Sequence, residues 1–309
     1  MPPSRDSGIL TVATVREETG RVLFLEREQI FSLPETDARA EISGRLREAQ
    51  ERKTPVRAVL DPRRGIVQRI TPATAKEIDE FERGRTLLEN PGRAVSVDIA
   101  EIDPTRFNIV DLTLKSPIFK LCTKIIPSYK KAKDIFDFCA QQSCHLPTPP
   151  TVTPCIPFQY VRDGCYARAH KMRWIIEEKY GYCCEKVFSF ANQNNDELSV
   201  RADKWGGCCV NWWYHVTPLV RVQIKISTFN FVIALAIDPG MFDKPVMLSS
   251  WLMAQENAAC SAHAKVSMYS IQPGSAYSPA NYSGTAFTTD PSYTATDATL
   301  IAYKNLTTC

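Results

Sequence analysis

The first 120 residues contain no cysteine, tryptophan, tyrosine or histidine. The whole 309-residue chain also lacks any run of eighteen apolar residues, which excludes a membrane-spanning helix. Neither sign of charge is in excess, because 37 Lys+Arg against 34 Asp+Glu leave a net charge of +3. That balance predicts neither a nucleic-acid partner nor a membrane-surface partner. No Cys-x-x-Cys pair occurs among the cysteines and only four histidines are present, so the ligand spacing of a zinc site is absent.

All eleven cysteines lie after residue 120, together with all five tryptophans and all eleven tyrosines. This concentration predicts disulfides formed in an oxidising compartment, and therefore a secreted protein. The opening residues, MPPSRDSG, have no basic-then-apolar signal pattern, so we expect any signal peptide to lie outside this sequence. An odd count leaves one cysteine over after five disulfides, and we expect one free thiol.

The length predicts two domains, and the composition changes near residue 120. Residues 1–120 hold 20 Lys+Arg and 20 Asp+Glu, whereas the remainder holds 17 and 14. One interpretation is two unrelated domains. The other is a charged, removable pro-segment ahead of a disulfide-linked mature enzyme.

Residues 1–84 have the pattern of a small α+β domain. A capping box at Thr74 and Glu77 predicts that a helix begins there and ends near Gly84. The expected strands are Ile9–Val15, Arg21–Leu25, Val56–Leu60 and Ile66–Ile70, and a further helix is expected from Thr36 or Asp37 to about Lys53. No residue of this segment is predicted to be catalytic.

Residues 85–121 carry only a weak pattern, and we expect a linker laid along a surface, with Lys115 and Lys120 as candidate processing points. The second domain, residues 122–309, is predicted to open with a helix from about Ser128 to Gln142. A proline-rich loop follows, closed by Cys144 and Cys155. The tail after Cys260 is expected to form short strands or ordered loop.

Cys165 is the first candidate for a catalytic residue. It directly precedes a stretch with helical spacing of apolar residues that ends at Gly181. At a helix start, unpaired N–H groups and the helix dipole lower a thiol pKa, and the N–H of the cysteine can bind a developing oxyanion. The alternative is that Cys165 is simply one end of a disulfide.

His215 lies in the middle of an apolar stretch, Val210–Val222, that predicts one continuous strand. Alternation places Trp213, His215 and Thr217 on one face, and Trp212 on the other. His215 is the preferred base for the thiol, although a histidine among aromatic residues can equally be a core residue. His170 is a weaker candidate, and His145 and His263 have no clear role.

Asp238 ends the next apolar strand, Asn230–Ile237, which we expect to pair antiparallel with the His215 strand through a turn at 223–229. A carboxylate at this position often caps the following turn. However, cysteine at a helix start, histidine on a strand and aspartate after the next strand is the order of papain-like and transglutaminase-like thiol enzymes. The spacing therefore favours a Cys165–His215–Asp238 catalytic triad.

Four sequence strings resemble bacterial protein-glutaminase, namely DGCYARAHKMR at 163–173, GYCCEK at 181–186, GGCCVNWWYHV at 206–216 and IDPGMF at 237–242. Members of that family are secreted enzymes that deamidate glutamine side chains in proteins to glutamate and release ammonia. The similarity runs from about Ile126 to at least Phe242. LREAQERKTPVRAVLDP and TPATAKEIDEF also resemble the family's pro-region.

The resemblance implies a mature domain of transglutaminase-like α+β fold, made as an inactive precursor. It implies that Cys165 is the nucleophile, His215 the general base and Asp238 the acid that orients the base. It implies no metal or organic cofactor, and glutamine-containing proteins and peptides as substrates. The precursor would then consist of an inhibitory pro-domain at 1–84, a linker at 85–121 and a catalytic domain at 122–309. We expect a monomer that a protease activates by cleavage near 115–125.

Cysteines 122, 139 and 183 depart from the family's pattern, and a Cys139–Cys183 disulfide is one hypothesis. The pairing of Cys260 and Cys309 stays open. Part of residues 1–120 is expected to cover Cys165. Three other functions fit the triad or the cysteines: a transglutaminase, a cysteine protease, and a binding module in which Cys165 is bridged and Trp205, Trp212 and Trp213 bind a ligand.

Overall fold

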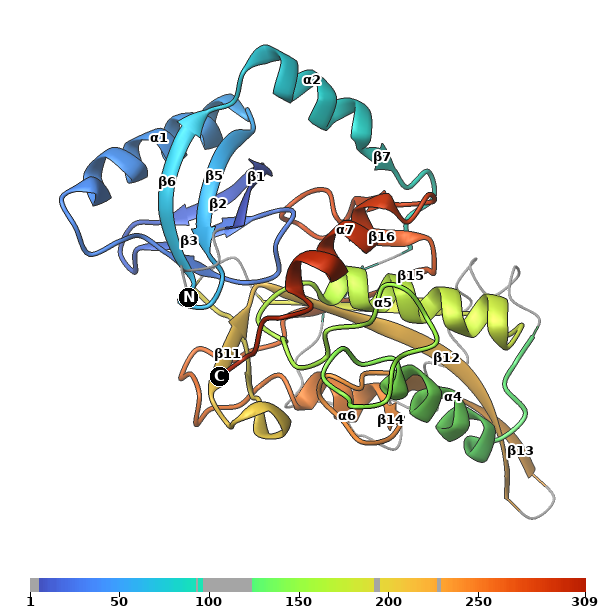
Figure 1. Cartoon of the computed structure of the whole chain (residues 1–309). Coiled ribbons are helices and arrows are strands. Elements are labelled where there is room, and N and C mark those ends of the chain that lie inside the picture. Colours follow the sequence, from blue (N-terminus) through green and yellow to red (C-terminus); the bar gives the residue numbers. More distant parts are fainter. Residues whose placement is uncertain (1–5, 93, 97–123, 192–194, 227–228) are drawn as a thin grey trace.

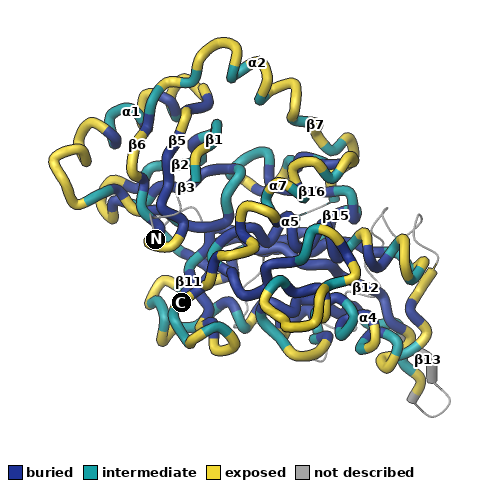
Figure 2. The backbone as a smooth tube through the Cα atoms, viewed as in Figure 1, coloured by how far each residue is buried: buried dark blue, intermediate teal, exposed yellow. Residues whose placement is uncertain are grey.

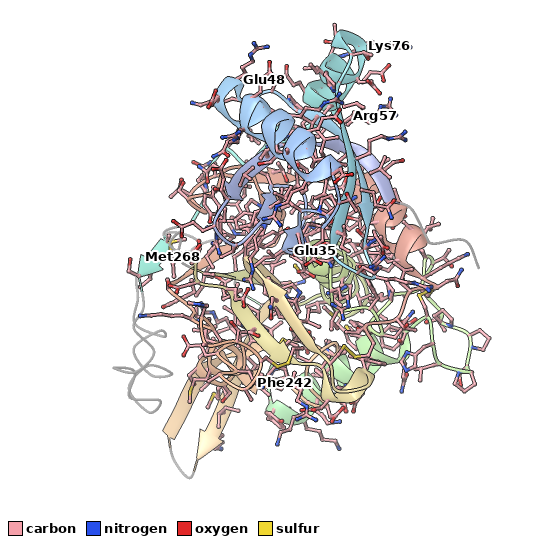
Figure 3. The ribbon with its side chains drawn as sticks, turned by 90° about the vertical axis from the view of Figure 1, so that its left-hand side faces the viewer. Glu35, Glu48, Arg57, Lys76, Phe242 and Met268 are labelled. Carbon is pink, nitrogen blue, oxygen red and sulfur yellow. A yellow bond between two sulfur atoms is a disulfide. The ribbon has the colours of Figure 1, made fainter. Side chains whose placement is uncertain are left out.

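The computed structural model describes residues 6–92, 94–96, 124–191, 195–226 and 229–309, and it confirms a mixed α+β fold with antiparallel sheets (Figure 1). Two units lie one on the other. Glu48 and Lys76 mark the outer end of the first unit, and Phe242 lies toward the opposite end of the molecule (Figure 3). Among the described residues, no helix combines the length and the hydropathy that crossing a bilayer requires.

The first unit is built on a six-stranded sheet, called here the N-terminal sheet, with strand order β1-β5-β6-β4-β3-β2. All its pairs are antiparallel except β4 with β6. Its apolar core includes Phe24, Phe31 and Leu46. The strands are β1 Asp6–Leu10, β2 Val12–Arg16, β3 Arg21–Phe24, β4 Phe31–Ser32, β5 Val56–Asp61 and β6 Ile66–Pro72.

The expected strand Ile9–Val15 is wrong, because the chain breaks at Thr11. The Thr11 N–H binds Oε2 of Glu26 at 2.8 Å, and the Thr11 carbonyl accepts the N–H of Leu25. The two halves therefore separate, and β1 pairs with β5 whereas β2 pairs with β3. Local alternation does not reveal this break, since the partners of Thr11 are more than ten residues away.

Two helices accompany the N-terminal sheet. Helix α1 (Ala38–Arg52) buries Ile42, Leu46 and Ala49. Helix α2 (Ala75–Gly84) begins with the predicted capping box, in which Thr74 Oγ1 accepts the Glu77 N–H and the Glu77 carboxylate accepts the Thr74 N–H.

The second unit is built on a six-stranded sheet of order β14-β13-β12-β9-β15-β8, in which every pair is antiparallel. Helix α4 (Tyr129–Gln141) begins after Ser128, whose hydroxyl accepts the Lys131 N–H. The remaining elements of this layer are β8 Ala94–Ser96, α5 Cys165–Trp174, β9 Glu185–Phe190, β12 Tyr214–Ile226, β13 Phe229–Ala236, β14 Val246–Met247, α6 Leu248–Met253 and β15 Met268–Pro273.

Alternation along β12 separates two apolar layers. Val220 packs in the cluster that contains α4 and α5 residues, whereas Leu219 packs in the cluster that contains Trp251 of α6. Buried residues are concentrated around α5 and β12, as Figure 2 shows. Leu23 and Leu25 of the N-terminal region belong to the same apolar cluster as α5. The two units therefore share a core, and the N-terminal region is held tightly against α5.

The central hairpin is tighter than predicted. β12 continues to Ile226 and pairs Ile226 with Phe229, so the expected turn at 223–229 is wrong and most of that stretch is strand. Each added pair on the two strands supplies further ladder hydrogen bonds, which favours the short connection.

The segment after α2 and the tail also carry regular structure. Strands β7 (Thr86–Leu87) and β8 pair with β17 (Phe287–Thr289) and β15, so these parts of the expected linker lie on the second unit. Lys115 and Lys120 lie outside the described residues. The tail contains an unpredicted helix, α7 (Thr294–Tyr303), in addition to strands. The other small elements are β10 Leu198–Arg201, β11 Cys209–Trp212 and β16 Ala276–Pro279.

Candidate active site

Cys165 is the first residue of α5, as predicted. Gly164 precedes it with φ +86°, and a Cβ there would meet the ring of Tyr303 at 2.9 Å, so only glycine fits this turn. The Cys165 N–H has no helical partner at this position and donates instead to Oε1 of Glu28 at 3.1 Å. The thiol is therefore buried at a helix N-terminus, beside a donor suited to an oxyanion.

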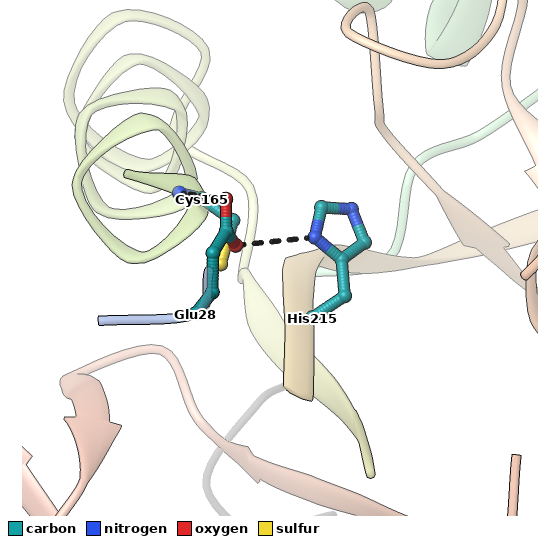
Figure 4. Close-up of side chains that lie close together, drawn as sticks. All are labelled: Glu28, Cys165 and His215. Atoms are coloured by element: carbon teal, nitrogen blue, oxygen red, sulfur yellow. Dashed lines mark hydrogen bonds and ion pairs between the residues drawn. The ribbon is translucent and has the colours of Figure 1, made fainter. Parts of the chain in front are cut away.

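The structure brings His215 and Asp238 together from β12 and from the end of β13. Nε2 of His215 lies 2.9 Å from Oδ2 of Asp238, and the same oxygen accepts Nε1–H of Trp251 at 3.0 Å. This hydrogen bond places a proton on Nε2 and leaves Nδ1 facing Cys165 and Glu28 (Figure 4). One carboxylate oxygen of Glu28, the sulfur of Cys165 and one imidazole nitrogen of His215 all lie within 4.8 Å of one another.

The predicted faces hold for His215 and Thr217 within β12 but are wrong for Trp212 and Trp213, which lie before it. The ladder is interrupted at Trp213 between β11 and β12, so Trp212 and His215 do not lie on opposite faces. Instead, the Trp212 ring stacks on the imidazole with centroids 4.3 Å apart and planes 8° apart. Trp251 also stacks on His215, with centroids at 5.5 Å. The imidazole thus has its plane fixed by indole rings and its direction fixed by Asp238.

The pKa values of the pair follow from these contacts. Burial acts to lower the pKa of His215, but the hydrogen bonds to Asp238 and Glu28 outweigh it and raise the pKa. Burial acts to raise the pKa of Asp238, but the hydrogen bonds from His215 and Trp251 outweigh it and lower the pKa. The arrangement stabilises an imidazolium beside an aspartate carboxylate.

Glu28, from the connection after β3, lies beside Cys165 and directs a carboxyl oxygen toward the imidazole of His215 (Figure 4). Its side chain is fully buried. Oε1 accepts the Cys165 N–H and lies 3.3 Å from Nη2 of Arg168, while Oε2 lies 3.4 Å from Nδ1 of His215. Among the described residues, Glu28, Cys165 and His215 are the only group of three histidine, cysteine or acidic side chains close enough together to share a metal ion. Their mutual hydrogen bonds already account for the proximity.

The main chain at Glu28 bends and is hydrogen-bonded to the second unit on both sides. Its N–H donates to Oδ1 of Asp163 at 3.1 Å, and its carbonyl accepts the Trp213 N–H at 3.1 Å. The next residue, Gln29, forms an antiparallel bridge with Trp212. A residue held through its own main chain by the second unit therefore presents its side-chain carboxyl group to Cys165. Sequence reasoning expected a covering segment but did not find Glu28, because nothing local distinguishes it from neighbouring acidic residues.

The expectation of a lowered thiol pKa is wrong for this form of the protein. Burial raises the pKa of Cys165 well above its usual value, and the nearby Glu28 carboxyl group raises it further. The helix N-terminus is present, but its favourable effect on a thiolate is smaller than the loss of solvent and the nearby acid. In this state Cys165 is a thiol that is poorly suited to attack.

The other histidines lie away from the thiol. Nε2 of His170 contacts the Asp290 carbonyl at 3.1 Å and its Nδ1 lies 2.7 Å from Nζ of Lys186. Burial and this lysine lower the pKa of His170 to about 2. His145 lies in the proline loop, and its ring contacts the ring of Trp205. His263 lies before β15, and its backbone N–H donates to the Ser261 hydroxyl.

Three disulfides lie within the described residues. Cys144–Cys155 closes the proline loop, as predicted, and Cys209–Cys260 and Cys208–Cys309 fasten the tail to the start of β11. The Cys139–Cys183 hypothesis is wrong, because Cys183 is disulfide-bonded whereas Cys139 is free.

The expectation of a single free thiol is also wrong. Cys139, Cys165 and Cys184 are all free and buried. Burial raises the pKa of Cys139 to about 12, so this thiol behaves as an apolar core side chain. A free Cys165 excludes the interpretation in which it is one end of a disulfide.

Comparisons with known proteins identify the family of this chain. A family model described as Glutaminase matches residues 132–255, a range that contains Cys165, His215 and Asp238. A crystal structure of protein-glutaminase is 34% identical, with a TM-score of 0.51, and the match covers 60% of this chain and 92% of that one. The chain belongs to the protein-glutaminase family. The structure of protein-glutaminase from Chryseobacterium proteolyticum is 33% identical, covering 59% and 90% of the two chains with a TM-score of 0.50.

The N-terminal region is also matched within the family. A mutant of pro-protein-glutaminase is 28% identical over 98% of this chain and 94% of its own, with a TM-score of 0.70. The protein is thus similar to a protein-glutaminase precursor over nearly its whole length. No curated protein sequence matches the chain.

Proposed function

We propose that this protein is a secreted protein-glutaminase precursor whose active form deamidates glutamine side chains in proteins and peptides. One observation carries the proposal. The group facing Cys165 is the side-chain carboxyl of Glu28, presented from the connection between β3 and β4 and hydrogen-bonded to the Cys165 N–H. Glutamate is the product of glutamine deamidation and has the same shape as glutamine. The site therefore already holds a product-like residue of the chain itself.

In the first half of the proposed reaction, the Cys165 sulfur forms a bond to the glutamine side-chain carbonyl carbon. The carbonyl oxygen takes the place of Oε1 of Glu28, where the Cys165 N–H and Arg168 would stabilise its negative charge. His215 takes the thiol proton and gives it to the leaving nitrogen. The carbon–nitrogen bond breaks, ammonia leaves and a thioester remains.

In the second half, His215 removes a proton from water, and the oxygen forms a bond to the thioester carbon. The carbon–sulfur bond breaks, Cys165 regains a proton and the substrate carries glutamate. Asp238 keeps the His215 proton on Nε2 and stabilises the charged imidazole in both halves.

Latency follows from the same contacts. The N-terminal region, proposed as a pro-domain at 1–84 joined through a linker at 85–121, fills the place of the substrate with Glu28 and buries the thiol. Because the segment is covalently attached, its effective concentration at the site is high. Cleavage near 115–125 followed by release of this region would expose the catalytic domain at 122–309 as a monomer.

Two related reactions use the same triad. A transglutaminase would pass the thioester to a lysine amine, and a cysteine protease would attack a main-chain carbonyl. The Glu28 side chain supports attack on a side-chain carbonyl and so disfavours the protease. A deamidase and a transglutaminase differ only in whether water or a lysine amine attacks the thioester.

The test is ammonia release from casein by the full chain, before and after limited proteolysis, with Cys165→Ala alongside. We expect release only after proteolysis and none from the variant. A transglutaminase would incorporate a labelled primary amine into casein and form less glutamate than the ammonia it releases. That result would favour transfer of the thioester to an amine. Full activity before proteolysis would contradict the inhibitory role of residues 1–84.

A further inference from the structure

The residues before and after Glu28 in sequence indicate how the site would contact a substrate peptide. If Glu28 stands where the substrate glutamine binds, then Arg27 stands for the residue immediately before that glutamine, and Gln29 for the residue immediately after it. This inference rests on the proposed deamidase function. It also takes a substrate peptide to bind in the same direction as the N-terminal segment.

Groups of the second unit fix the register of this segment through its main chain. Asp163 accepts the Glu28 N–H, and the Trp213 N–H donates to the Glu28 carbonyl. The indole Nε1–H of Trp213 also donates to the Arg27 carbonyl at 2.6 Å. Peptide groups on both sides of the glutamine position are therefore held by contacts that any substrate sequence offers.

The Arg27 side chain makes contacts that most substrate residues cannot offer. Its Nη1 donates to the Tyr166 hydroxyl at 2.9 Å, and its Nε lies 3.5 Å from Oδ2 of Asp163. Its remaining partner, Asp6, belongs to the N-terminal sheet and would leave with it. Asp163 and Tyr166 both belong to the proposed catalytic domain and would stay.

The carboxyl group of Asp163 is 1% exposed, and Arg27 is the cation paired with it among the described residues. Its other contacts are hydrogen bonds, from the Glu28 and Gly164 N–H groups and from the Tyr303 hydroxyl. A buried carboxylate that loses its cation is left uncompensated. A cationic side chain before the substrate glutamine would restore that partner.

We propose that the activated enzyme prefers glutamines that directly follow a basic residue, arginine more than lysine, with Asp163 and Tyr166 as the specificity-determining side chains. Arginine exceeds lysine because its planar guanidinium reaches the phenol and the carboxylate with separate nitrogens. An acidic residue at the same place meets a buried carboxylate of like charge.

The opposite side of the glutamine position supplies the matched control. The Gln29 side chain donates to the Pro62 carbonyl and accepts the Tyr160 hydroxyl, and among the described residues no hydrogen bond joins it to a charged side chain. A charge placed after the glutamine is therefore expected to have little effect.

The experiment uses enzyme activated by limited proteolysis of the full chain. Capped peptides carry one glutamine, preceded by arginine, lysine, alanine or glutamate, and a second set places the same residues after it. Ammonia release gives kcat/KM for each. We expect arginine before the glutamine to exceed alanine by about tenfold, since a hydrogen bond from a charged guanidinium to the Tyr166 hydroxyl is worth that order of magnitude. Glutamate is expected to fall below alanine, and the second set to vary much less.

A pair of variants tests the assignment. Tyr166→Phe should reduce the arginine-to-alanine ratio severalfold, because the hydroxyl that binds the guanidinium is lost. Tyr277 packs its ring against Tyr166, but the Arg27 guanidinium hydrogen-bonds the Tyr166 hydroxyl and not that of Tyr277. Tyr277→Phe should therefore change the ratio much less than Tyr166→Phe. Equal rates for all residues before the glutamine would overturn this inference and leave the deamidase function intact. No ammonia from any peptide or from casein would overturn the deamidase function itself.

Discussion

The Cys165 N–H donates to Oε1 of Glu28 at 3.1 Å, although the two residues are 137 positions apart. The donor that would stabilise an oxyanion is thus occupied by a carboxyl oxygen of the same chain. His215 reaches the second carboxyl oxygen at 3.4 Å. One side chain thus occupies the position proposed for the substrate oxygen and also contacts the imidazole, which would keep the proposed triad inactive.

Replacing the nucleophile should abolish deamidation. The activated Cys165→Ala enzyme is expected to release no ammonia from casein, because no thioester can form. Cys139→Ala is the matched control, since Cys139 is also a free, buried thiol but lies on α4 in the apolar core. Wild-type turnover by the Cys165 variant would contradict the mechanism, and loss of turnover by the control would indicate general damage.

The orienting role of Asp238 predicts a partial loss. Asp238→Asn in the activated enzyme should lower kcat by roughly 10²–10⁴-fold, because an amide holds the His215 tautomer poorly and does not stabilise its charge. Asp243→Asn makes the same chemical change on a side chain that is 87% exposed, and should leave kcat unchanged. Equal rates for the two variants would remove Asp238 from the mechanism.

The product-like position of Glu28 predicts a reaction within the precursor. In a Glu28→Gln precursor, the new amide lies against Cys165 and His215, so it should be converted back to glutamate on incubation. Peptide mass spectrometry would detect the amide-to-acid change. Glu26→Gln, two residues away with a carboxyl group bound to the Thr11 N–H, should stay an amide. Combining Glu28→Gln with Cys165→Ala should also leave the amide intact, and conversion in that double variant would point to spontaneous chemistry.

The raised thiol pKa predicts a change of reactivity on activation. Iodoacetamide should label Cys165 slowly in the precursor, where the thiol is 1% exposed and its pKa is raised by burial and Glu28. After proteolysis and release of the N-terminal region, labelling should become much faster. Cys139 and Cys184 are also free and buried, and they serve as internal controls that should stay unlabelled in both forms. Rapid labelling of Cys165 before proteolysis would show that Glu28 does not shield it.

Asp163 should make the precursor's stability depend on pH. Burial raises its pKa to about 6, so the folded state binds the proton more tightly than the unfolded state does. Its contribution to stability is complete below the ordinary aspartate pKa of about 4 and is lost as pH rises toward 6, by roughly 2–3 kcal/mol.

Asp163→Asn removes this titration. The difference in unfolding free energy between the wild type and this variant should therefore shift against the wild type as pH rises from about 4 to about 7. Denaturant unfolding at both pH values measures the difference. A difference that is constant across this range would show that Asp163 does not titrate there.

Several features of the site were predictable because they depend on neighbours in sequence. Gly164 and the following apolar spacing place Cys165 at a helix start, and the apolar strand before it places Asp238 at a strand end. The capping box at Thr74 is a contact between residues three apart. Periodicity and capping are local interactions, so the sequence reports them directly.

The tertiary structure decided the remaining features. The break at Trp213 that turns Trp212 onto His215 is not visible in the alternation of residues. The raised pKa of Cys165 and the position of Glu28 depend on packing the N-terminal region against α5. The sequence by itself determined the local settings of the proposed catalytic residues, namely a cysteine at a helix start, a histidine on a strand and an aspartate after the next strand. Whether they are exposed, charged and free to react depends on contacts between distant parts of the chain, because burial and electrostatic environment are properties of the packed molecule.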